Sequence, residues 1–490
     1  MLDPSRALIH ALLKCAMTAA LIATTARLPA AAAPKPNVVL ILADDLGWRD
    51  LACYGSDLHE TPHLDQLARE GMRFTQNYSA CTVCSPTRAA LMTGKYPARL
   101  HITDWIPGQM PDNPRLLVPD WTRHLPPEET TMAEVFQSAG YATASIGKWH
   151  LGDTPYYPEQ HGFDLNVAGT SKASPATGYF APWKIPTLPE GRDGDYLTDR
   201  LGEEAVKFIE RHRNRPFFLY LPHFAVHTPI QARKELIEKY RARPREGLTH
   251  GNAVYAAMIE SLDGTVGRIR ARLEELQLSD RTIIVFTSDN GGHLPTTSNK
   301  PLRLGKASAY EGGVRVPLIV HWPGVTKPGS VSDTPVITMD LFPTLLEMAG
   351  LSVPGSQSET GAAGRDGVSL VPLLRGTGAV ERTELFWHYP HHQHYQRGGA
   401  MPYGAIRSGD FKAIEFFNDM RVELYNIRED PGEQRDLAAA LPKKAEELGA
   451  RLHTWRKEAG AQMPAPNPKY DPAKAEYNPP PPRAKKEGDK

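Results

Sequence analysis

Short apolar runs that end in polar residues recur along the chain. Four of them cover residues 38–43, 141–146, 217–221 and 282–287. Helical patterns of apolar residues lie between them, for example over residues 62–70 and 254–276. Continuous apolar runs that alternate with helices are typical of parallel strands buried on both faces. The pattern therefore predicts an α/β fold, in which helices flank a large and mostly parallel central sheet.

The polar residues that follow these runs are the candidates for chemistry. They are Asp44 and Asp45, Lys148 and His150, His227, and the pair Asp289 and Asn290. Each group taken alone has a plain structural explanation, such as a turn, a helix cap or a hydrogen-bonded histidine. However, the carboxyl ends of parallel strands meet at one edge of a sheet, where open α/β folds bind their ligands. We therefore expect these side chains to form one site.

The last third of the chain has a different pattern. It begins with a loop rich in Ser and Gly over residues 352–367. Short strand patterns follow at 384–387, 403–407, 411–416 and 422–426, and a helical pattern covers 438–458. Short strands joined by tight turns predict a small antiparallel sheet with a helix. The segment 464–490, rich in Pro and Lys, has few residues that could join a core and is predicted to be a disordered tail.

Charge and the first residues of the chain indicate where the protein works. The 56 basic and 56 acidic side chains balance, which argues against affinity for nucleic acid. Residues 1–33 have the form of an export signal, with Arg6, an apolar stretch at 16–25 and small residues at 30–32. This stretch is too short to span a bilayer comfortably. We expect an exported protein, periplasmic or secreted, without stable membrane insertion; an uncleaved anchor is the alternative.

Three cysteines follow the expected signal. Cys81 and Cys84 form a Cys-x-x-Cys pair, which is compatible with a redox site or half of a zinc site. A zinc site made of cysteines needs four thiols, and only Cys53 remains, so this interpretation is disfavoured. Cys53 and Cys81 either form a disulfide or remain buried thiols, and the sequence leaves both options open.

Cys84 also belongs to a second pattern, Cys-x-Pro-x-Arg, with Pro86 and Arg88. Ser85 can cap a helix, Pro86 suits its first turn, and Gly94 is a typical end for it. Cys84 is therefore expected at a helix N-terminus, where free N–H groups favour anions. Arg88, one turn further on, can fork onto an anionic oxygen.

The run CSPTRAALMTGK, residues 84–95, resembles the signature of the sulfatase family, the formylglycine-dependent, arylsulfatase-like enzymes of the alkaline-phosphatase-like superfamily. The resemblance implies that a maturation enzyme oxidises Cys84 to formylglycine. It also implies an alkaline-phosphatase-like sandwich, with a catalytic domain over residues 34–375 and a C-terminal subdomain over 376–463.

The same resemblance assigns the other candidate residues. Asp44, Asp45, Asp289 and Asn290 match the positions that hold calcium in sulfatases, together with the modified Cys84. Their hard oxygen ligands suit one Ca²⁺ per chain. The resemblance further implies that the sulfate and the transition state are bound by Arg88, Lys148, His227 and Lys306. In the mechanism it implies, His227 or Lys306 protonates the leaving alcohol, and His150 takes a proton from residue 84.

The resemblance implies an exported sulfatase that hydrolyses sulfate esters. By analogy we expect sulfated carbohydrates as substrates, with aryl sulfates as surrogates. Two alternatives stay open: a phosphonate or phosphate-ester hydrolase of the same superfamily, and a non-catalytic protein that binds sulfated glycans.

Two further groups of residues are candidates for contact with the substrate. The first, shortly after the signature helix, comprises Arg99, His101, Asp104 and Trp105. The second is a dense cluster of His388, His391, His392 and His394. Its irregular spacing argues against a metal site, and a solvated loop is the plainest interpretation. A loop that reaches over the pocket to the substrate is the alternative.

Overall fold

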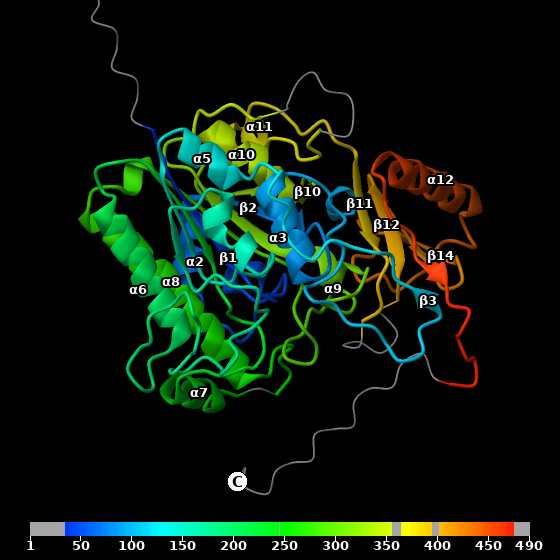
Figure 1. Ribbon diagram of the computed structural model, residues 1–490, viewed down its shortest axis with the longest axis horizontal. Coiled ribbons are helices and arrows are strands. Elements are labelled where there is room, and N and C mark those ends of the chain that lie inside the picture. Colours follow the sequence, from blue (N-terminus) through cyan, green and yellow to red (C-terminus); the bar gives the residue numbers. More distant parts are fainter. Residues whose placement is uncertain (1–34, 245, 355–363, 394–400, 475–490) are drawn as a thin grey trace, which may run out of the picture. The chain divides into compact units, whose positions relative to one another are not determined.

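The computed structural model describes residues 35–244, 246–354, 364–393 and 401–474 (Figure 1). The expected export signal, residues 1–33, lies outside these ranges, as does part of the loop predicted over 352–367. From Pro36 onward the described residues belong to one unit. Within the described ranges, no helix has both the length and the apolar character needed to cross a membrane.

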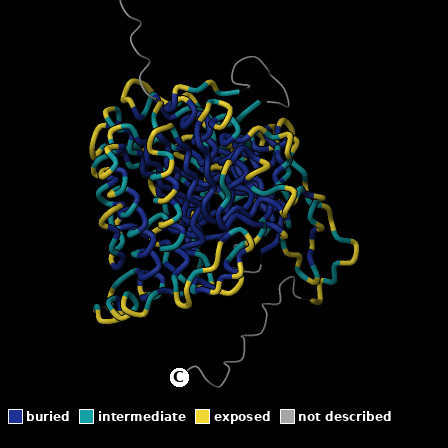
Figure 2. Tube along the Cα trace, turned by 60° about the vertical axis from the view of Figure 1, so that its left-hand side comes forward, coloured by how far each residue is buried: buried dark blue, intermediate teal, exposed yellow. Residues whose placement is uncertain are grey.

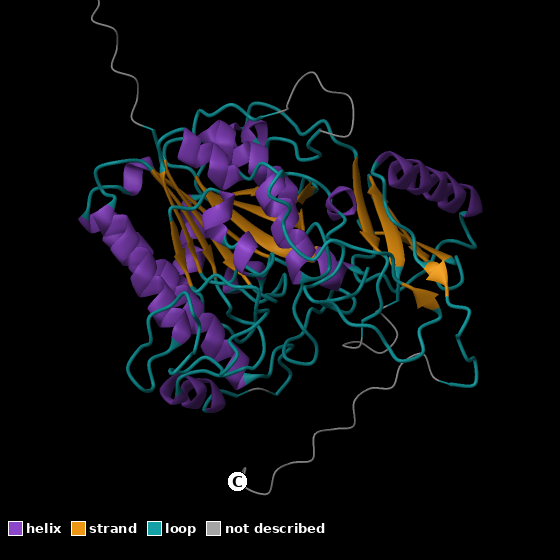
Figure 3. Ribbon diagram, viewed as in Figure 1, coloured by secondary structure: helices purple, strands orange, loops and turns teal. Residues whose placement is uncertain are grey.

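The large, mostly parallel sheet predicted from the sequence is confirmed (Figure 3). Among the described residues its strands lie in the order β10-β2-β8-β7-β1-β6-β4-β5, with β9 beside β2. The strand β8 runs antiparallel to β2 and β7, and the other pairings are parallel. The strands are β1 (Asn37–Ala43), β2 (Met72–Tyr78), β4 (Ala142–Ile146), β5 (Leu165–Val167), β6 (Phe217–Pro222), β7 (Thr282–Ser288), β8 (Arg315–His321), β9 (Ser330–Ser332) and β10 (Val336–Ile337).

Helices cover both faces of this sheet (Figure 1). On one face lie α2 (Pro62–Glu70), α6 (Leu197–Arg211), α7 (Lys234–Arg241) and α8 (Ala253–Glu275). On the other lie α3 (Cys84–Thr93), α4 (Pro97–Leu100), α5 (Met132–Ser138), α10 (Leu341–Met348) and α11 (Val371–Arg375). The helices expected over residues 62–70 and 254–276 correspond to α2 and α8.

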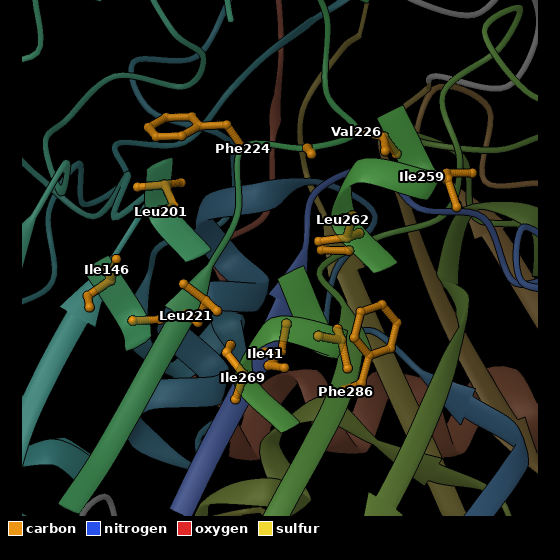
Figure 4. Packing of buried hydrophobic residues seen from close by; sticks show 14 of the residues in the cluster. Ile41, Ile146, Leu201, Leu221, Phe224, Val226, Ile259, Leu262, Ile269 and Phe286 are labelled. Carbon is orange, nitrogen blue, oxygen red and sulfur yellow. The ribbon is translucent and has the colours of Figure 1, made fainter. Parts of the chain in front are cut away.

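The side chains of the central strand β1 explain this two-sided core. Successive strand residues point to opposite faces, so Ile41 packs with α2, α6, α7 and α8, and Leu40 packs with the helices of the other face. Figure 4 shows Ile41 and Phe286 of adjacent strands next to Leu262 and Ile269 of α8. Figure 2 shows that buried residues dominate the interior and that exposed ones lie on outer helices and loops. A strand buried on both faces requires the continuous apolar runs seen in the sequence.

The predicted small antiparallel sheet is also confirmed. Its strands, in spatial order, are β11 (Glu384–Tyr389), β12 (Tyr403–Ser408), β13 (Phe411–Phe416) and β14 (Val422–Asn426). The helix α12 (Pro442–Glu458) packs on it through Leu448, Leu452 and Trp455. The domain limits drawn from the sequence, 34–375 and 376–463, stay predictions.

A buried ionic cluster ties this small sheet to the rest of the protein. Lys412 Nζ, on β13, lies 3.0 Å from a carboxylate oxygen of Glu311 and 3.0 Å from one of Glu433. All three side chains are fully buried, and the Tyr78 hydroxyl donates to Glu311 at 2.8 Å. Because Glu311 begins α9 (Glu311–Val314), shortly after Lys306, the cluster holds the small sheet against the segment that carries a predicted catalytic cation.

Replacing Lys412 with alanine is expected to lower the free energy of unfolding by about 3–5 kcal/mol, because two buried carboxylates would lose the cation they share. Lys444 provides a matched control, since its ammonium pairs with Glu447 at 3.0 Å on an exposed part of α12. Removing that pair should change stability by less than about 1 kcal/mol. Urea denaturation measures both variants, and equal stabilities would contradict the structural role of Lys412.

The first part of the predicted disordered tail, 464–490, has a defined structure. The strand β15 (Ala465–Pro466) pairs antiparallel with β3 (Leu116–Leu117), and Asn467 Nδ2 donates to the Pro114 carbonyl at 2.7 Å. These contacts join the segment to residues far away in the sequence, which composition does not reveal. Residues 475–490 lie outside the described ranges.

Candidate active site

Two neighbouring strands deliver the predicted metal ligands. Asp44 and Asp45 follow β1, and Asp289 and Asn290 follow β7, its parallel partner in register. Asp289 Oδ1 accepts a hydrogen bond from the Asp45 amide at 3.2 Å, and Asn290 Nδ2 donates to Asp45 Oδ1 at 2.8 Å. The structure therefore brings the four residues together at one edge of the sheet, as the pattern of apolar runs indicated.

The helix α3 places Cys84 at this edge. It begins at Cys84 itself and ends at Gly94, whose φ of 72° is the left-handed conformation typical of a helix end. The prediction that Ser85 caps this helix is wrong, because the helix starts one residue earlier and Ser85 lies in its first turn. The Ser85 hydroxyl instead donates to the carbonyl oxygen of His150 at 2.8 Å.

Two buried lysines lie against the carboxylates. Lys148 Nζ is 2.6 Å from Asp44 Oδ2, and Lys306 Nζ is 2.7 Å from Asp45 Oδ1. Lys306 Nζ also lies 3.5 Å from Cys84 Sγ, which in turn lies 3.7 Å from Asp44 Oδ1. The two ammonium groups therefore offer positive charge to an anion that reaches residue 84.

Arg88 is fully buried, and two nitrogens of its guanidinium bind a carboxylate. Its Nε and Nη2 lie 3.0 and 2.8 Å from Asp289 Oδ2, and its Nη1 donates to the Lys148 carbonyl at 2.8 Å. The sequence suggested a fork onto an anionic oxygen, and in the structure that oxygen belongs to Asp289. Arg88 therefore holds a predicted metal ligand in place.

The two predicted catalytic histidines have different surroundings. His150 is fully buried, its Nε2 lies 2.6 Å from the Ile106 carbonyl, and its Nδ1 has no hydrogen-bond partner within the described residues. Burial and nearby Lys148 hold the pKa of His150 well below its ordinary value. Since Nε2–H donates to a carbonyl, the neutral ring carries its lone pair on Nδ1 and can accept a proton there.

His227 is the more exposed of the two histidines. Its Nε2 lies 3.6 Å from Asp45 Oδ2 and its Nδ1 lies 2.7 Å from the Thr228 carbonyl. The side chain is 14% exposed, against 4% for Lys306. His227 is therefore closer to solvent than the lysines and Arg88.

Burial dominates the titration of the central groups. It raises the pKa of Asp44 to about 7, and the charge of Asp289 adds to the rise. It would raise the pKa of Asp45 too, but Lys306 and His227 outweigh it and hold that pKa below its usual range. Burial also raises the pKa of the Cys84 thiol to about 12. An unmodified Cys84 is thus a protonated thiol at neutral pH and a poor nucleophile.

The oxygen atoms at this edge fit a cation such as calcium. Three carboxylates share a small buried space, and Asn290 Oδ1 is buried there without a hydrogen-bond partner in the described residues. When the Asn290 side-chain amide is rotated by 180°, its oxygen takes the place of the nitrogen that now faces Asp45. Ligand atoms of Asp44, Asp45, Cys84 and His227 lie within 4.8 Å of one another. Carboxylate and amide oxygens are the ligands that calcium prefers.

The described cysteines, Cys53, Cys81 and Cys84, are all free thiols. The disulfide between Cys53 and Cys81 that the sequence left open is therefore absent from this part of the chain. Cys84 gathers with carboxylates and a histidine rather than with Cys81, so the zinc interpretation of the Cys-x-x-Cys pair has no support in the described residues.

Three of the four pocket candidates after the signature helix make contacts within the fold. Arg99 Nε pairs with Asp366 at 2.9 Å, and His101 Nε2 bonds to a main-chain carbonyl at 3.1 Å. Asp104 is buried and accepts the Tyr389 hydroxyl at 2.6 Å. These side chains hold the segment after α3 against the C-terminal region.

The histidine cluster is buried rather than solvated. His388, His391 and His392 are 5%, 1% and 8% exposed, and each Nε2 bonds to a main-chain carbonyl or a threonine hydroxyl at 2.8–3.0 Å. The prediction of a solvated loop is wrong for these three. His391 and His392 contact Thr103 and Leu116, and His388, on β11, contacts the Gln462 carbonyl and the Phe417 ring. His394 lies outside the described residues. Trp105, the fourth pocket candidate, is half-buried.

Two contacts that Ile106 makes in the site could not be predicted from the sequence. The Ile106 carbonyl orients the His150 ring, and the Ile106 amide donates to Ser85 Oγ at 3.1 Å. The carbonyl and the amide belong to the main chain, so residue type carries no information about them. Only the fold shows that this segment crosses behind His150.

A sheet of this topology, with buried carboxylates and cationic side chains at the carboxyl ends of its strands, has the alkaline-phosphatase-like fold. The family model described as Sulfatase matches residues 36–351, and the model described as N-sulphoglucosamine sulphohydrolase, C-terminal, matches residues 304–459. The chain belongs to the sulfatase family, and it is a sulfuric ester hydrolase.

Relatives match along most of the chain. A sulfatase of Formosa agariphila is 33% identical over 86% of this chain and 88% of its own length. The N-acetylgalactosamine-6-sulfatase of Canis lupus familiaris is 36% identical over 80% of this chain and 74% of its own. Among solved structures, Ps i-CgsB superposes with a TM-score of 0.73 and 30% identity, covering 88% of this chain and 94% of that one.

Proposed function

We propose that this sulfatase is exported, acts on sulfated carbohydrates, and uses Cys84 oxidised to formylglycine next to a calcium ion held by Asp44, Asp45, Asp289 and Asn290. The observation that carries the proposal is the setting of Cys84. Its Sγ lies 3.5 Å from Lys306 Nζ and 3.7 Å from Asp44 Oδ1, yet burial raises its pKa to about 12. The position suits a nucleophile, but a thiol that stays protonated at neutral pH is a poor one.

The hydrated aldehyde supplies two hydroxyls on one carbon, one to take the sulfuryl group and one whose deprotonation expels sulfate. Calcium supplies positive charge and Lewis acidity beside residue 84. Lys148 and Lys306 bind the sulfate oxygens, and Arg88 keeps Asp289 in place behind them.

His227 and His150 handle the protons. Burial and nearby Lys306 hold the pKa of His227 well below its ordinary value. The charge of a bound sulfate opposes this effect and favours the protonated ring, from whose Nε2 the leaving alcohol takes a proton. His150 accepts a proton from residue 84 on Nδ1, since its Nε2 donates to Ile106. In the first step an oxygen on residue 84 would form a bond to sulfur while the S–O bond to the alcohol breaks. In the second the Cβ–O bond to the sulfate would break, which restores the aldehyde for hydration by water.

Carbohydrate substrates are supported by the relatives. One is an N-acetylgalactosamine-6-sulfatase, and Ps i-CgsB has been solved in complex with k-i-k-neocarrahexaose. The phosphonate or phosphate-ester alternative has less support, because the described site offers oxygen ligands for one cation rather than histidines for two. Rates on matched sulfate and phosphate esters separate the two activities.

Mass spectrometry of the peptide over residues 74–95, from protein made in its native host, tests the central step. We expect a mass in which the thiol is replaced by an aldehyde, together with reaction with a hydrazide tag. A peptide that carries only the thiol, in protein with no turnover, would instead support the non-catalytic glycan-binding alternative. The proposed export is tested by sequencing the mature N-terminus, which we expect just after residues 30–33.

The His150→Ala variant is expected to lower kcat by about 10²–10⁴-fold and to release one equivalent of alcohol in a rapid burst. The first sulfuryl transfer does not need Nδ1 of His150, but the release of sulfate does. Stopped-flow assays with a chromogenic aryl sulfate measure both phases. His212→Ala, at the end of α6, is the control. A slow variant without a burst would contradict this assignment.

A further inference from the structure

The proposed calcium ligands come from two loops that lie far apart in the sequence. One loop, residues 44–50, follows β1, and the other, residues 289–299, follows β7. Carboxylates that share a small buried space repel one another. The arrangement of the ligands therefore depends on the groups that join the two loops behind them.

Asp50 joins both loops to the helix α8. Its carboxylate is fully buried, and Oδ2 accepts hydrogen bonds from the Gly47 amide at 2.7 Å and the Tyr255 hydroxyl at 2.7 Å. Its Oδ1 accepts the Thr297 hydroxyl at 2.7 Å. Gly47 belongs to the first loop, Thr297 to the second and Tyr255 to α8. One side chain thus fixes three segments, and we call these four residues the Asp50 network.

Tyr255 connects the Asp50 network to a proposed metal ligand. Its hydroxyl also donates to the carbonyl oxygen of Asp45 at 3.1 Å, so that its single proton is shared between this oxygen and Asp50 Oδ2. Asp45 has a φ of 60°, a left-handed conformation that is unfavourable for a residue with a side chain. Such a conformation persists only where the surroundings impose it. Tyr255 and Asp50 are among the groups that do so here.

The two loops also touch directly. A Cβ atom on Gly47 would lie 2.6 Å from Asn299 Oδ1 and 2.8 Å from Asp50 Oδ2, which leaves no room for a side chain. Asn299 Oδ1 in turn accepts the Gly292 amide at 3.1 Å. The loops are therefore in close contact at the level of Asp50.

Histidines rather than lysine or arginine balance the charge of Asp50. His250 Nε2 lies 3.3 Å from Asp50 Oδ1, and its Nδ1 lies 2.7 Å from Asp57. Burial would lower the pKa of His250, but the two carboxylates outweigh it and raise that pKa. His59 Nδ1 bonds to the Asp50 carbonyl at 2.8 Å. His250 Nε2 has no hydrogen-bond partner within the described residues, so its 3.3 Å contact with Asp50 is an ion pair only. The three residues pack together as a charged support below the two loops.

We propose that Asp50 is a positioning residue of the calcium site and acts through Tyr255 and Thr297. It fixes the backbone of Asp45 and holds the loop of Asp289 and Asn290 against it, although it is not itself a ligand. The inference rests on the calcium site of the proposed function, and it assigns part of the calcium affinity to residues outside that site.

Calcium titration calorimetry on the full chain tests this, with Cys84 unmodified and no substrate present. Tyr255→Phe and Thr297→Val each remove one arm of the Asp50 network with little change in shape. Each is expected to weaken calcium binding by about 10–100-fold, the usual effect of losing a group that orients metal ligands. Asp50→Asn should weaken it at least as much, and the two milder variants decide the question if that protein does not fold.

Tyr196→Phe is the matched control. It removes a buried tyrosine hydroxyl that donates to the Gln231 carbonyl at 2.7 Å and not to a member of the Asp50 network. Its thermal stability should fall and its calcium affinity should not. If Tyr255→Phe and Thr297→Val both bind calcium with wild-type affinity, the positioning role of Asp50 is overturned and the calcium site of the proposed function is not affected. Absence of calcium binding by the wild-type chain would overturn the metal assignment of the proposed function, and this inference with it.

Discussion

The Cys84→Ser variant is expected to lose multiple turnover, with a fall in kcat on the order of 10⁴–10⁶-fold, the scale seen when a covalent nucleophile is lost. A serine is not converted to an aldehyde by the proposed route, and a sulfated serine has no second hydroxyl on its carbon to expel sulfate. Because oxygen replaces sulfur in a side chain of the same shape, the fold should persist. A continuous assay with an aryl sulfate measures the rate.

Intact-mass spectrometry extends the Cys84→Ser experiment. At most one sulfate per chain should accumulate on the variant. Cys53→Ser serves as the control, because Cys53 is a half-buried thiol outside the site and its loss should leave kcat unchanged. Sustained turnover by Cys84→Ser would refute the proposed chemistry, whatever the state of the wild-type residue.

The Arg88→Ala variant is expected to lose about 10²–10³-fold in kcat and about 3–5 kcal/mol in stability without calcium. Arg88 is fully buried, its guanidinium lies 2.8 Å from Asp289 and 3.7 Å from Asp44, and its loss leaves these carboxylates without that cation. Calcium also compensates carboxylates, so adding it should restore much of the stability. Thermal unfolding with and without calcium measures this coupling.

Arg99→Ala is the control for this experiment. Arg99 pairs with Asp366 at 2.9 Å, and both side chains are partly exposed. Its removal should lower stability slightly and should not alter the response to calcium. An Arg88→Ala protein with normal kcat, or with the same calcium response as Arg99→Ala, would show that the pair with Asp289 does not support the site.

The central sheet could be predicted because its strands are buried on both faces. That burial requires uninterrupted apolar runs such as 38–43 and 282–287, which are visible in the sequence. The meeting of Asp44 with Asp289 followed from the same reasoning, since neighbouring parallel strands deliver their next residues to one edge. Periodicity therefore carried information about the site as well as the fold.

The details that the sequence did not reveal depend on contacts between distant segments. Only the fold shows that Arg88 pairs with the carboxylate of Asp289, while its expected contact with the sulfate stays a prediction. The cluster from His388 to His392 is polar by composition, yet it is buried between two parts of the chain. Asp50 looks like an ordinary turn residue until Tyr255 and Thr297 are seen to converge on it.

The burial of residue 84 requires that any oxidation of this residue comes before folding. In the folded protein Cys84 is 2% exposed and Arg88 is fully buried, so the segment that carries the signature is closed to another enzyme. Any catalyst that oxidises this thiol has to meet the nascent polypeptide before the sheet and helices assemble around it. A molecule that folds first is expected to stay permanently inactive, even when the oxidising enzyme is supplied later.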